Sequence, residues 1–178
     1  MSEYPFVLVL GGARSGKSRY AEALATNAAQ TVTYVATAGP PRDDEMRARI
    51  AVHRARRPAG WVTLEVERAI GEPIRTAGGV VLLDCMTLWL TNVMLAECDI
   101  ASEVDGLLEA IAARRGPVVA VSNEVGEGIV PQTSLGRAFR DEQGVLNQRL
   151  ARSATTVVKM VAGYPLVVKP SSQPEISL

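Results

Sequence analysis

GGARSGKS at residues 11–18 directly follows the apolar run FVLVL at residues 6–10 and precedes a stretch of helix-forming residues. It fits the pattern G-x-x-x-x-G-K-[ST] of a phosphate-binding loop, whereas a simple glycine turn is the alternative. In such a loop the backbone N–H groups surround the β-phosphate, the lysine reaches the β- and γ-phosphates, and the last hydroxyl binds Mg²⁺. The sequence thus predicts a nucleoside triphosphate site with Ser18 on the metal, built from Gly11, Gly12, Ala13, Arg14, Ser15, Gly16, Lys17 and Ser18.

Length and charge limit the class of protein. A chain of 178 residues is long enough for one well-buried domain and short for two. We expect a single catalytic domain over residues 1–170 and a flexible tail over 171–178. Lysine plus arginine and aspartate plus glutamate both number 19, so the formal net charge is zero. Neither nucleic acid nor a membrane surface is therefore a favoured partner.

Nothing in the sequence indicates secretion or membrane insertion. No apolar run approaches the roughly 18 residues that a membrane-spanning helix needs. No basic-then-apolar signal precedes the first predicted strand. Cys85 and Cys98 form neither a C-x-x-C pair nor a metal-binding spacing. We therefore expect a protein of the reducing cytoplasm.

Apolar runs rich in β-branched residues alternate with helical stretches, a pattern typical of a parallel sheet buried on both faces. The predicted fold class is α/β, a RecA-like P-loop NTPase domain. A short run at 166–169 follows Gly163 too closely for a crossover, so it should pair antiparallel as an edge strand. We predict the other strands at 5–10, 31–37, 61–66, 79–84, 117–122 and 156–161. We predict helices at 17–29, 43–56, 86–96, 101–114 and 134–153, and the pattern is weakest at 67–76.

A carboxylate ends the fourth predicted strand, in the sequence VVLLD at residues 80–84. It resembles a Walker B element, which brings an acidic oxygen to the C-terminal edge of the sheet beside the phosphate loop. Asp84 would then hold Mg²⁺ together with Ser18. The alternative is an aspartate that only begins a turn. The following residues 87–92 could supply hydroxyls to a ligand, but we prefer a helix that packs its apolar residues inward.

The only histidine of the chain, His53, lies among arginines in the segment 40–58. Three of them, Arg54, Arg56 and Arg57, crowd the end of a predicted helix. One interpretation is a solvated basic helix end, which the helix dipole favours. The other is chemical, because a neutral imidazole is a nucleophile toward phosphorus and nearby arginines would neutralise the phosphate that it attacks. In that case His53 would become covalently nucleotidylated.

Beyond these motifs the chain resembles, over nearly its whole length, the bifunctional adenosylcobinamide kinase / adenosylcobinamide-phosphate guanylyltransferases of cobalamin biosynthesis. The resemblance is carried by the phosphate loop and by several further stretches. These are Arg19, Ala21 and Glu22 directly after the loop, YVATA at 34–38, DEM at 44–46, Arg49, Ile50, His53, Arg57 and Pro58, SNEVG at 122–126, GIVP at 128–131, and FRD at 139–141 with Gly144, Asn147, Gln148 and Leu150. The stretches at 122–131 and 139–150 are the most specific.

The resemblance implies two reactions. ATP or GTP would phosphorylate adenosylcobinamide, and GMP from GTP would then pass through a guanylyl-histidine to give adenosylcobinamide-GDP. The guanylyl carrier would be His53, since Val52 stands where many members have an adjacent histidine. Lys17 would be the second catalytic residue. Nucleotide contacts would extend from the phosphate loop to Ala36, Thr37, Ala38, Arg54, Ala55, Arg56, Arg57, Glu65 and Asp84.

The resemblance also implies a homotrimer, with the corrinoid as a substrate and not as a bound cofactor. Attack on the α-phosphorus would require the helix at 43–57 to close over the nucleotide. The loop at 123–131 follows the fifth strand, at the edge where open α/β sheets bind ligands, so it could meet the corrinoid or the guanine.

Other functions are compatible with a phosphate loop. A GTPase switch is disfavoured, because SNEV at 122–125 stands where Asn-Lys-x-Asp is expected and DCMT at 84–87 lacks Asp-x-x-Gly. A RecA-like DNA-binding module would need a basic stripe, which the zero net charge disfavours. The nearest alternative is a monofunctional small-molecule kinase in which His53 is idle.

Overall fold

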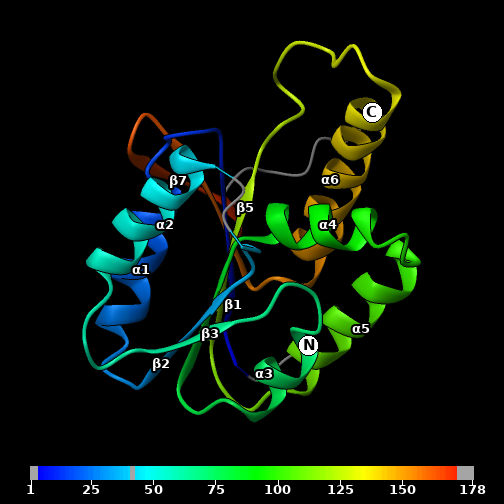
Figure 1. Ribbon diagram of the computed structural model, residues 1–178. Coiled ribbons are helices and arrows are strands. Elements are labelled where there is room, and N and C mark those ends of the chain that lie inside the picture. Colours follow the sequence, from blue (N-terminus) through cyan, green and yellow to red (C-terminus); the bar gives the residue numbers. More distant parts are fainter. Residues whose placement is uncertain (1–3, 41–42, 172–178) are drawn as a thin grey trace.

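A single β-sheet forms the centre of the molecule (Figure 1). The computed structural model describes residues 4–40 and 43–171. These residues form seven strands in the order β3-β2-β4-β5-β1-β6-β7. The strands are β1 (Phe6–Gly11), β2 (Val32–Ala36), β3 (Val62–Glu65), β4 (Val80–Asp84), β5 (Val118–Asn123), β6 (Thr156–Val161) and β7 (Tyr164–Lys169). The prediction of an α/β fold is confirmed.

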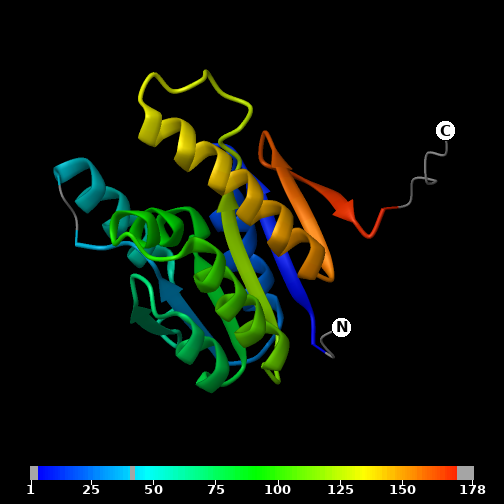
Figure 2. The same cartoon turned by 90° about the vertical axis from the view of Figure 1, so that its right-hand side faces the viewer.

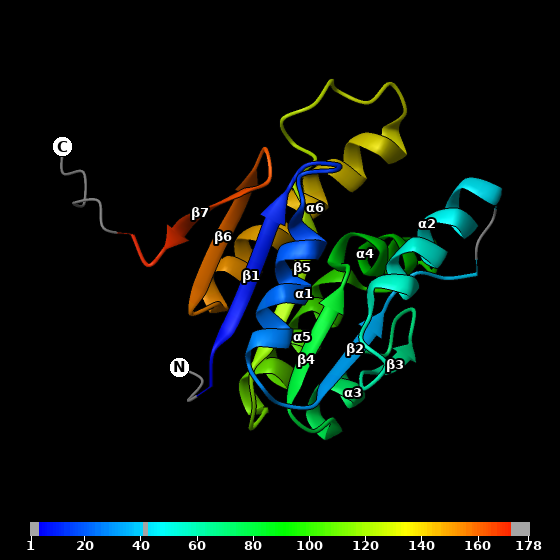
Figure 3. The same cartoon turned by 90° about the vertical axis from the view of Figure 1, so that its left-hand side faces the viewer.

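The sheet is parallel except at one edge. Among the described strands, β7 alone runs antiparallel, to β6. β1 lies between β5 and β6, with Val7 opposite Val119 and Thr156. The carboxyl ends of the parallel strands therefore meet at one edge of the sheet, which is the upper edge in Figure 3. That edge is where open α/β sheets bind their ligands.

Helices cover both faces of the sheet (Figures 2 and 3). On one face α1 (Lys17–Asn27) packs its Ala21 and Ala25 against strand residues such as Val9. The opposite face is covered by α3 (Gly71–Thr76), α4 (Met86–Leu95), α5 (Ile100–Ala113) and α6 (Ser134–Ser153), and Trp89 and Leu146 lie in that core. α2 (Asp44–Arg56) lies beside α1 in Figure 1. In the described ranges, none of the helices is both long and apolar enough to cross a bilayer.

The edge hairpin turns earlier than the sequence pattern predicts. Ala162 and Gly163 have φ angles of 50° and 88°. Two successive positive φ angles are typical of a tight two-residue hairpin turn. Tyr164 and Pro165 therefore belong to β7, which is longer than the predicted strand at 166–169. Proline is tolerated there because β7 is an edge strand. Of the predicted tail, residues 172–178 lie outside the described residues.

Helix α3 (Gly71–Thr76) lies within the segment 67–76, where the sequence pattern is weakest. The buried side chain of Arg114 donates hydrogen bonds to the carbonyl oxygens of Ile74 at 2.5 Å, Ala77 at 2.8 Å and Gly79 at 2.5 Å. These carbonyls lie at or just beyond the end of α3, where backbone oxygens lack helical partners. A guanidinium from the end of α5 thus caps α3, a contact that short-range sequence patterns do not report.

Candidate active site

The phosphate loop lies at the carboxyl end of β1 and leads into α1. Gly16 has a φ angle of 91°, a left-handed conformation that favours glycine. A Cβ atom on Gly11 would lie 2.5 Å from Ser15 Oγ and 3.1 Å from the carbonyl oxygen of Met160. Both glycines are therefore required by the path of the loop.

The polar groups of the loop suit an anion. Lys17 Nζ donates a 3.0 Å hydrogen bond to the carbonyl oxygen of Gly12, which brings its ammonium over the loop. Burial lowers the pKa of Lys17 from its usual value, and the nearby acidic groups oppose that effect. Ser15 Oγ is buried and has no hydrogen-bond partner among the described residues. A cation, an unpaired hydroxyl and the N-terminus of α1 together fit a bound phosphate.

Asp84 lies at the carboxyl end of β4, opposite Ala36 of β2 and Val121 of β5. Its side chain is only 9% exposed. Its Oδ2 accepts a 2.5 Å hydrogen bond from the hydroxyl of Tyr34. Burial opposes ionisation of this carboxyl, but its contacts with His53 and Tyr34 and the charge of Lys17 outweigh burial and lower the pKa of Asp84. Asp84 is therefore an ionised carboxylate inside the site.

The residues predicted to hold Mg²⁺ fit that ion. Ser18 offers a hydroxyl from the first turn of α1, and Asp84 offers an ionised carboxylate oxygen. Mg²⁺ prefers oxygen ligands and is commonly bound through one or two protein groups, substrate phosphates and water. Both donors are therefore of the kind that Mg²⁺ binds.

Helix α2 brings His53 to the Asp84 carboxylate. Asp43 caps the helix by accepting a 2.7 Å hydrogen bond from the backbone N–H of Met46. His53 lies in the last turn, with Nδ1 3.6 Å from Asp84 Oδ2 and about a third of its side chain exposed. The only histidine of the chain thus lies beside the proposed metal ligand.

Arg56 connects His53 to α1. Its Nη2 lies 3.2 Å from His53 Nδ1 and 3.1 Å from Glu22 Oε1. Arg56 and Asp84 therefore approach the same imidazole nitrogen from different elements. A guanidinium requires that nitrogen as an acceptor, whereas a carboxylate requires it as a donor. At 3.2 Å the Arg56 contact is within hydrogen-bond distance, whereas the 3.6 Å contact with Asp84 is an ion-pair distance.

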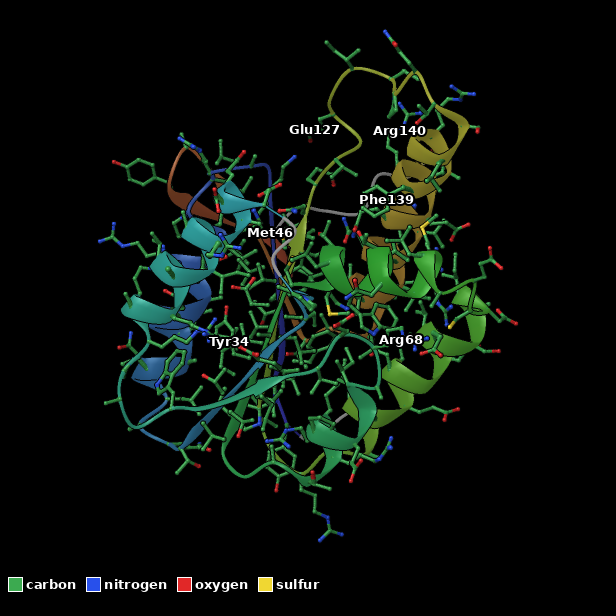
Figure 4. The ribbon with its side chains drawn as sticks, in the orientation of Figure 1. Tyr34, Met46, Arg68, Glu127, Phe139 and Arg140 are labelled. Atoms are coloured by element: carbon green, nitrogen blue, oxygen red, sulfur yellow. The ribbon has the colours of Figure 1, made fainter. Side chains whose placement is uncertain are left out.

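Arg54 of α2 and Arg57, the residue that follows this helix, face an open cleft beside β3. Arg54 forms an ion pair with Glu65 at the end of that strand. The guanidinium carbon of Arg57 lies 3.7 Å from the ring centroid of Tyr34, a cation–π contact. Figure 4 shows Tyr34 on the side of the sheet where α1 and α2 lie. The cleft has a volume of about 620 Å³ and is lined by Arg54, Arg57, Pro58, Ala59, Trp61, Thr63 and Glu65.

Ala36, Thr37 and Ala38 lie at the carboxyl end of β2, next to the end of β4. Thr37 is fully buried, and its Oγ1 donates a 2.7 Å hydrogen bond to the carbonyl of Cys85 and accepts one of 2.9 Å from the N–H of the same residue. The Thr37 side chain is therefore engaged in joining the two strand ends. The backbone N–H of Thr37 also donates to the carbonyl oxygen of Asp84, and the Thr37 carbonyl oxygen accepts a hydrogen bond from the Asn92 side chain.

The structure divides the predicted site residues into two groups. The phosphate loop, Asp84, His53 and Arg56 lie together at the strand ends. Arg54, Arg57 and Glu65 line the cleft beside β3. Ala55 and Arg14 are exposed to solvent.

Two residues at the site, Glu22 and Tyr34, are missing from the predicted set. Tyr34 has no local signal of a role, since it lies in an ordinary buried strand. Glu22 does have a local signal of a role, because it follows Ser18 by four residues and so lies on the same side of α1 as the predicted metal ligand.

Solved structures with a similar fold include a recombinase and an ATPase. The RadB recombinase superposes with a TM-score of 0.52 at 17% identity, over 87% of this chain and 73% of that chain. An ATPase of the type III secretion system of pathogenic bacteria gives a TM-score of 0.56 at 14% identity, over 87% of this chain and 50% of that chain. At such identities the likeness concerns the fold alone, and it confirms the predicted fold class.

Sequence relatives are much closer. A family model described as cobinamide kinase / cobinamide phosphate guanyltransferase matches residues 7–168. The bifunctional adenosylcobalamin biosynthesis protein CobP of Pseudomonas aeruginosa is 48% identical, over 91% of this chain and 96% of that protein. Its counterpart CobU of Escherichia coli is 41% identical, over 92% of this chain and 99% of that protein. The resemblance inferred from the motifs is confirmed, and the chain belongs to the cobinamide kinase / cobinamide phosphate guanyltransferase family.

Proposed function

We propose that this protein phosphorylates adenosylcobinamide with ATP or GTP and then transfers GMP from GTP to the product, through a guanylylated His53, to give adenosylcobinamide-GDP. Membership of the family supports both reactions and argues against a monofunctional kinase. The observation that carries the proposal is the position of His53, whose Nδ1 lies 3.6 Å from Asp84 Oδ2 beside the phosphate loop. A nucleophile for phosphorus and a triphosphate site are thereby adjacent.

In the first reaction the oxygen of the substrate alcohol forms a bond to the γ-phosphorus. The bond from that phosphorus to its bridging oxygen breaks, the nucleoside diphosphate leaves, and the proton of the alcohol passes to water. The protein contributes mainly position and charge stabilisation. Lys17 and the amides of the loop would stabilise the phosphate oxygens, and Ser18 and Asp84 would hold Mg²⁺, which neutralises further charge when bound.

In the second reaction the lone pair of an unprotonated nitrogen of His53 forms a bond to the α-phosphorus of GTP. The bond from that phosphorus to the oxygen of the β-phosphate breaks, and pyrophosphate leaves. A phosphate oxygen of adenosylcobinamide phosphate then attacks the same phosphorus, the P–N bond breaks, and the imidazole is regenerated. Arg56, whose Nη2 lies 3.2 Å from His53 Nδ1, would stabilise the phosphate oxygens in both steps.

The guanine of GTP is proposed to lie in the cleft beside β3. Arg57 and Trp61 offer flat surfaces to a heterocycle. The ring centroids of Trp61 and Tyr34 are 6.2 Å apart. Glu65 would accept hydrogen bonds from N1–H and the 2-amino group of guanine, a pair of donors that adenine lacks. A carboxylate has about four acceptor positions, so this pairing is compatible with its ion pair to Arg54.

The corrinoid is proposed to approach along the loop between β5 and α6. Ile129 on this loop is 97% exposed, and Val130 and Leu135 are also exposed. Figure 4 shows Glu127 on the loop and Phe139 and Arg140 on the adjoining part of α6. Apolar side chains gathered near the ligand-binding edge of a sheet are typical of a binding surface. A large macrocycle with apolar faces suits that surface.

A homotrimer in the cytoplasm, with residues 1–170 as one catalytic domain, completes the proposal. The edge strand β7 exposes Tyr164, Leu166, Val167 and Val168. A long apolar edge strand promotes association unless it is covered. Light scattering coupled to size-exclusion chromatography should give a molar mass three times that of one chain. The substitution Val167→Lys should lower this measured mass. A monomeric wild-type protein would contradict this part of the proposal.

Product analysis separates the two reactions. His53→Ala is expected to phosphorylate adenosylcobinamide at about the wild-type rate and to form no adenosylcobinamide-GDP. Lys17→Ala is expected to lose both products, because the ammonium contacts the phosphates. Mass spectrometry of the corrinoid fraction distinguishes the phosphate from the GDP derivative. Formation of the GDP derivative by folded His53→Ala would contradict the guanylyl-histidine.

A further inference from the structure

Glu22 is a charged residue on the inner side of α1 that the proposed reactions leave without a role. It is 9% exposed, next to Ala21, which packs against the sheet. It follows Ser18 by four residues on the helix that begins at the phosphate loop. Carboxylates are rarely buried unless they are paired, so a nearby cation is needed.

The cation comes from α2. Glu22 Oε1 accepts a 3.1 Å hydrogen bond from Arg56 Nη2, and the same nitrogen lies 3.2 Å from His53 Nδ1. One ligand atom each of Glu22, His53 and Asp84 lies within 4.8 Å of the other two. A continuous set of contacts therefore runs from α1, through Arg56, to the imidazole beside Asp84.

We propose that Glu22 is a positioning residue for guanylyl transfer, which fixes the guanidinium of Arg56 beside the imidazole of His53, where it meets the phosphate that His53 attacks. This inference rests on the proposed function of His53. Glu22 acts through Arg56 and not on the nucleotide, and the contact also ties α2 to the helix that carries the phosphate loop.

Exposure and charge both favour this role. The Arg56 side chain is 38% exposed, so a guanidinium released by Glu22 can turn into solvent and leave His53. The amide of glutamine carries no charge, so Glu22→Gln leaves no unpaired buried carboxylate and should cost little folding stability. Reaction rate is more sensitive, because a misplacement of about 1 Å can cost about a hundredfold. Loss of Glu22 should therefore affect the transfer reaction more than the fold.

The test measures how fast GTP labelled on its α-phosphate modifies His53 in the presence of Mg²⁺. Glu22→Gln keeps the size of the side chain but removes the charge that holds Arg56. We expect labelling at saturating GTP to slow about tenfold or more, with γ-phosphoryl transfer to adenosylcobinamide and the melting temperature nearly unchanged. Glu22→Asp, which keeps the charge, should recover part of the rate. Glu109→Gln, an exposed glutamate on α5, is the matched control and should label at the wild-type rate.

A double-mutant cycle tests whether Glu22 acts through Arg56. Because both changes break one contact, Glu22→Gln with Arg56→Gln should label no more slowly than Arg56→Gln alone. The positioning role is overturned if the double variant is slowed by the product of the two single effects, or if Glu22→Gln labels at the wild-type rate. Labelling of the wild type would still uphold the proposed function. An unlabelled wild type would overturn both. If Glu22→Gln does not fold, a wild-type rate in Arg56→Gln overturns the inference by itself.

Discussion

Nδ1 of His53 lies 3.6 Å from Oδ2 of Asp84, so the side chain proposed to carry GMP meets the carboxylate proposed to hold Mg²⁺. The imidazole comes from the last turn of α2 and the carboxylate from the end of β4. The α- and γ-phosphorus atoms belong to one triphosphate chain and are separated by only a few bonds. One nucleotide site with both residues at hand therefore suffices for phosphoryl transfer and for guanylyl transfer.

The hydroxyl of Tyr34 is expected to orient Asp84 for both reactions. Tyr34→Phe removes the 2.5 Å hydrogen bond to Asp84 Oδ2 and keeps the ring beneath Arg57. We expect kcat of each reaction to fall about fivefold, as the loss of about 1 kcal/mol of hydrogen bonding implies. Tyr34→Leu also removes the ring, so it should raise KM for GTP in addition. Steady-state kinetics of both reactions measure this, and wild-type kcat values in Tyr34→Phe would refute it.

Arg114 is expected to matter for stability and not for catalysis. Its guanidinium donates to the carbonyl oxygens of Ile74, Ala77 and Gly79, at and just beyond the end of α3. Arg114→Met would leave those oxygens without the donors that cap the helix, and we expect the free energy of unfolding to fall by about 3 kcal/mol. Urea denaturation measures the change. Arg115→Met, at an exposed position, is the control, and equal stability of the two variants would contradict the capping role.

Cys85 is expected to react slowly with alkylating agents. Burial, with a contribution from Asp84, raises the pKa of its thiol to about 11. A raised pKa means that the reactive thiolate is scarce below pH 11, and its fraction grows about tenfold for each pH unit. Peptide mass spectrometry should therefore find iodoacetamide on Cys98 before Cys85, with the Cys85 rate still rising nearly tenfold between pH 9 and pH 10. A Cys85 rate that levels off in that interval would show an ordinary thiol.

Ile129 is expected to contribute to corrinoid binding. It is 97% exposed on the loop between β5 and α6. Ile129→Asp places a charge where an apolar face of the macrocycle would lie, so KM for adenosylcobinamide should rise about tenfold, which corresponds to about 1.4 kcal/mol. The dissociation constant for GTP should not change. Val145→Asp, at a half-exposed position further along α6, is the matched control. Equal KM values in the two variants would remove the loop from the corrinoid site.

The residues predicted from sequence are those whose signal is local. GGARSGKS at 11–18 is one contiguous loop, and Asp84 ends an unmistakable apolar strand. His53 is the only histidine and lies in a cluster of arginines. For the loop and Asp84, residue type and near neighbours together indicate a chemical role, whereas the role of His53 as guanylyl carrier is predicted from the resemblance to the family.

The residues that sequence reasoning missed depend on contacts between distant elements. Tyr34 is one apolar-looking strand residue among several until its hydroxyl meets Asp84, which the pairing of β2 with β4 brings about. Glu22 gains a role when α2 places Arg56 against α1. The end of α3 is capped by Arg114, which lies 40 residues from Ile74 in the sequence. Contacts of this kind arise when distant elements pack together, and a short stretch of sequence does not reveal them.

Covalent labelling tests the central claim most directly. The protein is incubated with Mg²⁺ and GTP labelled on the α-phosphate, denatured, and compared with His53→Ala. We predict label on the wild type that is lost in acid and stable in base, as expected of a phosphoramidate, and none on the variant. No label on a folded, GTP-binding wild-type protein would contradict the guanylyl-histidine and leave phosphoryl transfer as the only reaction of the site.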